Sequence, residues 1–146
     1  MSDLDVEALA RTIWGEARSG GRAAMSHVAS VVLNRVAVAQ AHVLRSWRPH
    51  PLYGAGNAIG ACLAPLQFSC WNAGDPNRPK LIAVSDADAM FGEAQTIARA
   101  AIDGRLSDET RGATHYHARS MAAPPGWAAG LTPTFVDGLH RFFRPE

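Results

Sequence analysis

The chain has little of several features that mark large classes of protein. Two cysteines in 146 residues exclude a disulfide-rich scaffold. No run of about 18 residues is free of charged or strongly polar side chains, which excludes a transmembrane span. Fourteen basic against thirteen acidic side chains leave a net charge of +1. Because no bulk field then attracts nucleic acid or an acidic membrane, we expect a compact ligand or a near-neutral polymer as partner.

The chain does contain enough apolar sequence for one hydrophobic core. Hydrophobic residues make up 47% and charged residues 18% of the 146 positions, which suits one well-filled core and is too little for two. The sequence contains no internal repeat, low-complexity tract or linker. We therefore expect residues 1–146 to form a single domain, and we expect a monomer.

Two amphipathic helices are predicted in the first third of the chain. Apolar residues recur at i, i+3, i+4 and i+7 over residues 6–17, with Ser2 or Asp3 as candidate cap and Gly20-Gly21 as the stop. A similar apolar stripe predicts a second helix from about residue 22 towards residue 41. Its stripe would pack on the first helix.

The middle of the chain is predicted to be a long loop followed by a third helix. Residues 47–81 are rich in Pro, Gly and Asn, and a loop of this length is often functional. The third helix is predicted to begin at Ser85, whose spacing to Asp88 resembles a capping box, and to end at Gly104. Its buried side would contain apolar residues from Ala87 onwards.

Strand signals follow the third helix. Residues 113–118, 134–136 and 139–143 are β-prone, and Asp137-Gly138 between the last two runs is a strong hairpin signal. The predicted fold class is α+β, in which helices are followed by a small antiparallel sheet.

Glu16 differs from the other acidic residues, most of which lie where water can reach them. On a helical wheel it falls beside Leu9, on the shoulder of the buried face. It also lies near the helix C-terminus, where the macrodipole and partial burial both disfavour a charged carboxylate. These are the surroundings of a general acid. The alternative is a structural glutamate that pairs with Arg18 or a backbone donor.

Five short blocks of sequence are informative because they occur together and in order. They are Ile-Trp-Gly-Glu-Ala-Arg at 13–18, Val-Val-Leu-Asn-Arg-Val at 31–36, Gln-Phe-Ser at 67–69, Gly-Ala-Thr-His-Tyr at 112–116 and Gly-Leu-His-Arg-Phe at 138–142. In this order and approximate spacing the chain resembles the SleB-type cell-wall hydrolase family over nearly its whole length. No block is specific alone.

The resemblance implies a lysozyme-like catalytic domain that cleaves the glycan strands of peptidoglycan, without a cofactor. Such a domain is related to lytic transglycosylases and resuscitation-promoting factors. By this match Glu16 is the general acid. The family often continues its first block as Glu-Ala-Arg-Gly-Glu, whereas this chain has Ser19-Gly20-Gly21 after the arginine. We therefore assign no role to a second glutamate there.

The bond between N-acetylmuramic acid and N-acetylglucosamine can be broken by two routes. Muramidase-type hydrolysis normally needs two carboxylates about 5 to 10 Å apart, and candidates for the second are Asp75, Asp108 and Asp137. A lytic transglycosylase needs only Glu16, which protonates the leaving oxygen while the C6 hydroxyl of the muramic acid closes a 1,6-anhydro ring. The resemblance implies the second route, and hydrolysis is the alternative.

Five further residues are predicted to bind substrate. In this family the loop that carries Gln67 and Ser69 lines the cleft, and short polar side chains suit the N-acetyl and hydroxyl groups of sugars. Trp71 offers a ring that can stack on a sugar. Thr114 and Tyr116 alternate with two histidines and share one face of the predicted strand, with Tyr116 pointing at Glu16.

Two different classes of function are also compatible with the sequence. His115 and His117 on one strand face, completed by His140 on a neighbouring strand, would make a zinc site of an amidase or peptidase. A non-catalytic glycan-binding module would use the rings of Trp71 and Trp127. The preferred prediction, a glycan-cleaving domain with Glu16 as general acid, assigns no metal ion to the protein.

Two expectations depend on the cellular compartment. Residues 1–5 are acidic where a signal peptide is basic, so we expect synthesis in the cytoplasm without a signal peptide. With a cell-wall substrate in the periplasm, that combination is expected of a phage or prophage endolysin, or of a virion-associated enzyme. In an oxidising compartment, a bond between Cys62 and Cys70 would close the loop that carries Gln67 and Ser69 and would stabilise the protein by about 2 to 3 kcal/mol.

Overall fold

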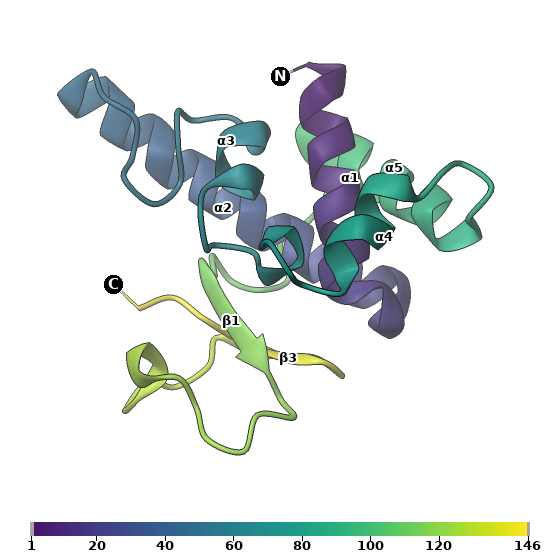
Figure 1. The fold of residues 1–146 in the computed structure, drawn as a ribbon. Coiled ribbons are helices and arrows are strands. Elements are labelled where there is room, and N and C mark those ends of the chain that lie inside the picture. Colours follow the sequence, from purple (N-terminus) through teal and green to yellow (C-terminus); the bar gives the residue numbers. More distant parts are fainter. Residues whose placement is uncertain (1, 146) are drawn as a thin grey trace.

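The computed structural model describes residues 2–145, in which a layer of helices is followed by a small sheet (Figure 1). The elements are α1 (Asp3–Ala17), η1 (Arg18–Gly20), α2 (Gly21–Ser46), α3 (Ala58–Leu63), η2 (Ser69–Trp71), α4 (Asn77–Ala83), α5 (Ala89–Ile102), β1 (His115–Ala118), η3 (Gly126–Ala128), β2 (Phe135–Val136) and β3 (His140–Phe143). The predicted α+β class is confirmed. Within these residues, no helix combines the length and apolar character needed to cross a membrane.

The helix α1 begins with a complete capping box. Asp5 donates its N–H to the Ser2 hydroxyl, and the Asp5 carboxylate accepts the Ser2 N–H at 2.8 Å. The other carboxylate oxygen accepts the N–H of Ile59 at 3.1 Å, so the same side chain also holds α3 against α1. The structure thus confirms Ser2 as the cap.

Three helices form the main core. α1 packs against both α2 and α5, and Figure 1 shows the long α2 crossing α1 with the sheet beyond the end of the helical layer. The buried apolar residues of these helices are Val6, Leu9, Ala10, Ile13, Trp14 and Ala17 from α1, Ala24, Met25, Val28, Ala29, Val32 and Val36 from α2, and Phe91, Ala94, Ile97, Ala98 and Ala101 from α5. The first two sets follow the predicted helical spacing.

Several predicted boundaries were wrong. α2 continues to Ser46 and ends at Trp47, which takes a left-handed conformation with φ +60°. The segment 47–81 is not one loop, because it contains α3, η2 and most of α4. The third predicted helix starts later than Ser85, since Asp88 is its N-cap and accepts the N–H of Phe91 at 2.9 Å. Ala87 precedes the helix and is exposed.

The sheet is antiparallel and has the strand order β1-β3-β2. β2 and β3 are joined through Asp137-Gly138, as predicted. β1 pairs with β3 so that Tyr116 is opposite Phe142 and His117 is opposite Arg141. Phe142 is fully buried against Val31 of α2, and this contact joins the sheet to the helical layer.

A second connection between sheet and helices is made by Asp137. One of its oxygens accepts the backbone N–H groups of Leu139 and His140 at 2.8 and 2.7 Å, and the other lies 2.7 Å from Nδ1 of His27 on α2. Burial alone would raise the pKa of Asp137, but the hydrogen bonds from His27 and the two N–H groups hold it below its ordinary value.

The substitution Asp137→Asn is expected to lower the free energy of unfolding at pH 7 by about 1 to 2 kcal/mol, because bonds to a charged acceptor are replaced by weaker ones. Since the folded-state pKa is lowered, the contribution of Asp137 is present above its unfolded value of about 3.9 and is lost as the pH falls through the folded value. Urea unfolding between pH 7 and pH 2 measures this difference.

The matched control is Asp103→Asn, which removes the same charge from an exposed pair with Arg105. It should change the free energy of unfolding by less than about 0.5 kcal/mol. A difference between wild type and Asp137→Asn that does not shrink at low pH would contradict the assignment.

Candidate active site

Glu16 lies one residue before the end of α1 and borders a hollow of about 420 Å³. The walls of this hollow come from the end of α1, from residues 66–69, from the start of α4 and from β1. The side chain is half-buried, so one part of the carboxyl group is held by protein and another faces the hollow.

Three donors hold the Glu16 carboxylate. The Tyr116 hydroxyl donates to one oxygen at 2.5 Å. The Cys70 N–H donates to the other at 3.2 Å, and the Ser69 hydroxyl lies 3.4 Å from that same oxygen. One carboxylate oxygen is held by β1, and the other is held by η2. The sheet and the loop segment therefore meet at Glu16.

Tyr116 is a fixed donor in this arrangement. Burial of its side chain, the charge of Glu16 and the hydrogen bond to Glu16 all raise the pKa of Tyr116 well above its ordinary value. Its hydroxyl consequently keeps its proton at any pH near neutrality. The ring lies against His140 and Phe142, with centroids 4.6 and 5.7 Å away.

Gly15 permits the close approach of η2 to α1. A Cβ at this position would lie 3.1 Å from both the Cβ and the Sγ of Cys70, and 2.9 Å from a methyl group of Leu81. Such contacts are shorter than side chains tolerate without moving. The glycine before Glu16 therefore lets the Cys70 N–H reach the carboxylate.

The structure brings some of the predicted site residues together and leaves others apart. Gln67, Ser69 and Tyr116 border the hollow with Glu16. Trp71 does not border it, because its indole N–H donates to the Thr12 hydroxyl at 2.9 Å and its ring packs on the core.

Thr114 is also outside the Glu16 hollow. It is buried, and it borders a separate hollow beside α2 that is also lined by Asn34. Asn34 itself donates to Asp108 and to the Ala113 carbonyl at 3.0 and 2.9 Å, which fixes the connection between α5 and β1. Both residues therefore hold the polypeptide around β1.

None of the three candidates for a second carboxylate borders the Glu16 hollow. Asp75 accepts the N–H of Asn77 at 2.8 Å at the start of α4. Asp108 accepts hydrogen bonds from Thr110, Gly112 and Asn34, and Asp137 holds the hairpin as described above. Among the described residues that line the hollow, Glu16 alone carries a carboxylate.

Arg35 borders the hollow, although no role was predicted for it from the sequence. Arg35 is buried, donates from Nε to the Thr114 carbonyl at 2.7 Å and lies over the Phe68 ring. Its Nη1, like Nδ1 of His140, has no hydrogen-bond partner within residues 2–145. A signal for Arg35 was available, because it is a charged residue on the apolar stripe of α2, three positions after Val32.

The three-histidine zinc site is contradicted by the strand register. His115 and His117 lie on the outer face of the sheet, where their rings contact Trp127. His140 is opposite Ala118, so it lies on the inner face, with its ring against Tyr116. Over the described residues, no group of three His, Cys, Asp or Glu side chains is arranged to hold a metal ion.

Cys62 and Cys70 are free thiols, and both are buried. Burial raises the pKa of Cys62 to about 12, and burial with the nearby charge of Glu16 raises the pKa of Cys70 as well. Both sulfurs therefore stay protonated and unreactive in the folded protein. The backbone of Cys70, and not its thiol, contacts Glu16.

The chain belongs to the Cell Wall Hydrolase family, whose sequence pattern it matches over residues 19–143. The family resemblance and the lysozyme-like α+β fold expected from it are therefore confirmed, and peptidoglycan is the substrate class. No curated protein and no solved structure gives a significant match. Glu16 precedes the matched range, whereas Ser69, Cys70 and Tyr116, which contact it, lie within that range.

The substitution Gly15→Ala is expected to slow peptidoglycan cleavage by about 10-fold, because displacement of η2 moves the Cys70 N–H away from Glu16. Overpacking should cost about 1 to 3 kcal/mol of stability, partly offset by the higher helix propensity of alanine. Release of soluble fragments from purified peptidoglycan and urea unfolding measure the two effects.

Gly92→Ala is the control, because a Cβ at Gly92 of α5 meets no atom within 4 Å. It should stabilise the protein by about 0.5 to 1 kcal/mol and leave cleavage unchanged. Equal behaviour of the two variants would show that the contact at Gly15 does not control the site.

Proposed function

We propose that this cell wall hydrolase cuts the glycan strands of peptidoglycan between N-acetylmuramic acid and N-acetylglucosamine as a lytic transglycosylase. Glu16 acts first as general acid and then as general base. The supporting observation is the lining of the hollow, in which Glu16 is the one carboxylate among the described residues. A hydrolase of the usual two-carboxylate type needs a partner at about 5 to 10 Å, and the candidates Asp75, Asp108 and Asp137 are bonded elsewhere.

In the first step, Glu16 transfers its proton to the oxygen that links the two sugars, and the bond from that oxygen to C1 of the muramic acid breaks. Negative charge develops on Glu16 as the proton leaves. The donors from Tyr116, Cys70 and Ser69 are already in position to stabilise that charge, which lowers the barrier without rearrangement of the site.

In the second step, the C6 hydroxyl of the same muramic acid attacks C1. The Glu16 carboxylate takes the hydroxyl proton, and the 1,6-anhydro ring closes. Glu16 is then protonated again, so the cycle consumes no water and needs no second carboxylate. One residue serves both steps because the glycosidic oxygen leaves C1 and the C6 oxygen then bonds to the same C1, so both oxygens exchange a proton with Glu16 at one place.

The other residues of the hollow have binding and positioning roles in this proposal. Gln67 is half-buried in the wall, where its amide can meet the N-acetyl groups of the sugars. Ser69 and Tyr116 fix the orientation of the Glu16 carboxyl group. Arg35 also borders the hollow, and its Nε holds the Thr114 carbonyl next to β1.

The substitution Glu16→Gln is expected to reduce cleavage by about 100-fold to 10,000-fold, since the group that transfers the proton is removed. Digestion of purified peptidoglycan, followed by mass spectrometry of the soluble muropeptides, should give 1,6-anhydromuramoyl ends with the wild type. Glu7→Gln on the same helix is the control and should cleave like the wild type, because Glu7 pairs with Arg11 outside the hollow.

Each other outcome identifies a different mechanism. Reducing ends in place of anhydro ends would mean that water attacks C1. Cleaved peptide bonds with intact glycan would overturn the assignment to glycan strands. If binding to glycan persists with no cleavage by the wild type, the protein is a glycan-binding module.

The substitution Tyr116→Phe is expected to lower kcat by roughly 10-fold to 100-fold with little change in KM, because it removes a hydrogen bond to a group that becomes charged during the reaction. Steady-state kinetics on soluble glycan fragments measure both constants. A rise in KM with unchanged kcat would instead make Tyr116 a residue that only binds substrate.

A further inference from the structure

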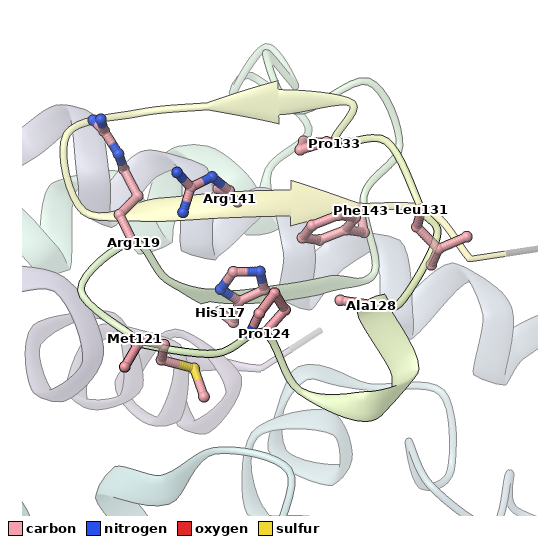
Figure 2. Close-up of a pocket in the computed structure, with 10 residues that line it drawn as sticks. His117, Arg119, Met121, Pro124, Ala128, Leu131, Pro133, Arg141 and Phe143 are labelled. Atoms are coloured by element: carbon pink, nitrogen blue, oxygen red, sulfur yellow. The ribbon is translucent and has the colours of Figure 1, made fainter.

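A second hollow, of about 450 Å³, lies on the outer face of the sheet. It is formed between β1, β3 and the connection 119–133, which passes over that face (Figure 2). His117 and Met121 border both this hollow and the one that contains Glu16. The two hollows therefore meet at β1, which is an edge strand of the sheet.

The two ends of the second hollow differ in chemistry. Figure 2 shows the guanidinium groups of Arg119 and Arg141 toward one end, and Phe143, Leu131 and Ala128 at the other. The strand register explains why Arg141 lies in this hollow, because Arg141 is opposite His117 and shares its face of the sheet. At the apolar end, the Phe143 ring contacts that of Trp127, with centroids 5.3 Å apart.

Within residues 2–145, no carboxylate forms an ion pair with either arginine. The ion pairs of these residues involve Arg11, Arg22, His27, Arg99 and Arg105. Arg119 donates only to a backbone carbonyl, that of Asp137, at 3.0 Å. Two guanidinium groups that border one hollow lined by no carboxylate of the described chain have the chemistry that suits an anion with planar oxygens.

We propose that this second hollow binds the peptide stem of the muramic acid whose glycosidic bond lies at Glu16. This inference rests on the proposed function. The peptide is joined to muramic acid itself, so it leaves the sugar close to the bond that is cut. It carries free carboxylates, which suit Arg119 and Arg141, and alanine methyl groups, which suit the apolar end. His117 and Met121 form the passage between the two hollows.

The site makes a clear prediction about which glycan strands are preferred. Three substrates separate the contributions: strands with stems that carry free carboxylates, strands with the same carboxylates converted to amides, and strands from which an amidase has removed the stems. The wild type should cleave the first with a kcat/KM about 10-fold to 100-fold higher than the third, the range expected for a charge-assisted hydrogen bond. The amidated strands should resemble the third substrate.

Arg141→Gln is the main test variant, and Arg45→Gln is its control. The first should bring the ratio of kcat/KM between stem-bearing and stripped strands close to one. The second removes the same charge from the last turn of α2, outside both hollows, and should keep the wild-type ratio. Arg119→Gln should also reduce the ratio, which guards against a misfolded single variant.

A binding measurement that needs no cleavage separates failure of this inference from failure of the proposed function. The tripeptide L-alanyl-γ-D-glutamyl-diaminopimelate is titrated into the Glu16→Gln variant, and the methyl resonance of Met121 is followed by NMR. A shift that Arg141→Gln abolishes supports the stem site, even if the reaction products are not anhydro sugars. No shift, or equal cleavage of all three substrates by the wild type, overturns the stem site and leaves glycan cleavage by Glu16 intact.

Discussion

The contact between Gly15 of α1 and Cys70 of η2 is the constraint from which the geometry of the site follows. Because Gly15 has no Cβ, the Cys70 backbone lies directly against the helix and its N–H reaches the next side chain, that of Glu16. Leu81 of α4 rests on the same glycine. With η2 and α4 fixed in this way, β1 forms another wall of the hollow, and its Tyr116 completes the hydrogen bonds to the carboxylate.

Sequence patterns predicted the elements that are long or that have a specific turn. α1 extends over four turns and the hairpin has Asp-Gly between its strands, so both leave a signal that a single chain can show. α3 and α4 have six and seven residues, which is too short for an apolar period to appear. The start of α5 was misplaced because Ser85 and Asp88 are both good caps and only the tertiary fold selects between them.

At the candidate site too, local patterns predicted some features, and the tertiary packing decided the others. Burial of one helix shoulder pointed to Glu16, and strand alternation placed Thr114 on the same side as Tyr116. Two residues along a strand span about 6 to 7 Å, however, and that step takes Thr114 out of the Glu16 hollow and into a separate one that Asn34 also lines. Local patterns give the face on which a side chain lies, whereas its distance from a residue on another element depends on how the elements pack.

The three donors to Glu16 lie 53, 54 and 100 residues away from it along the chain. Forming contacts at such separations costs conformational entropy, because the intervening loops must close. A partial opening that undocks the sheet while the helices stay folded removes the Tyr116 contact, because Tyr116 is on β1, and leaves the donors from η2 in place. Spectroscopic helix content is therefore a poor measure of whether the donors around Glu16 are all in place.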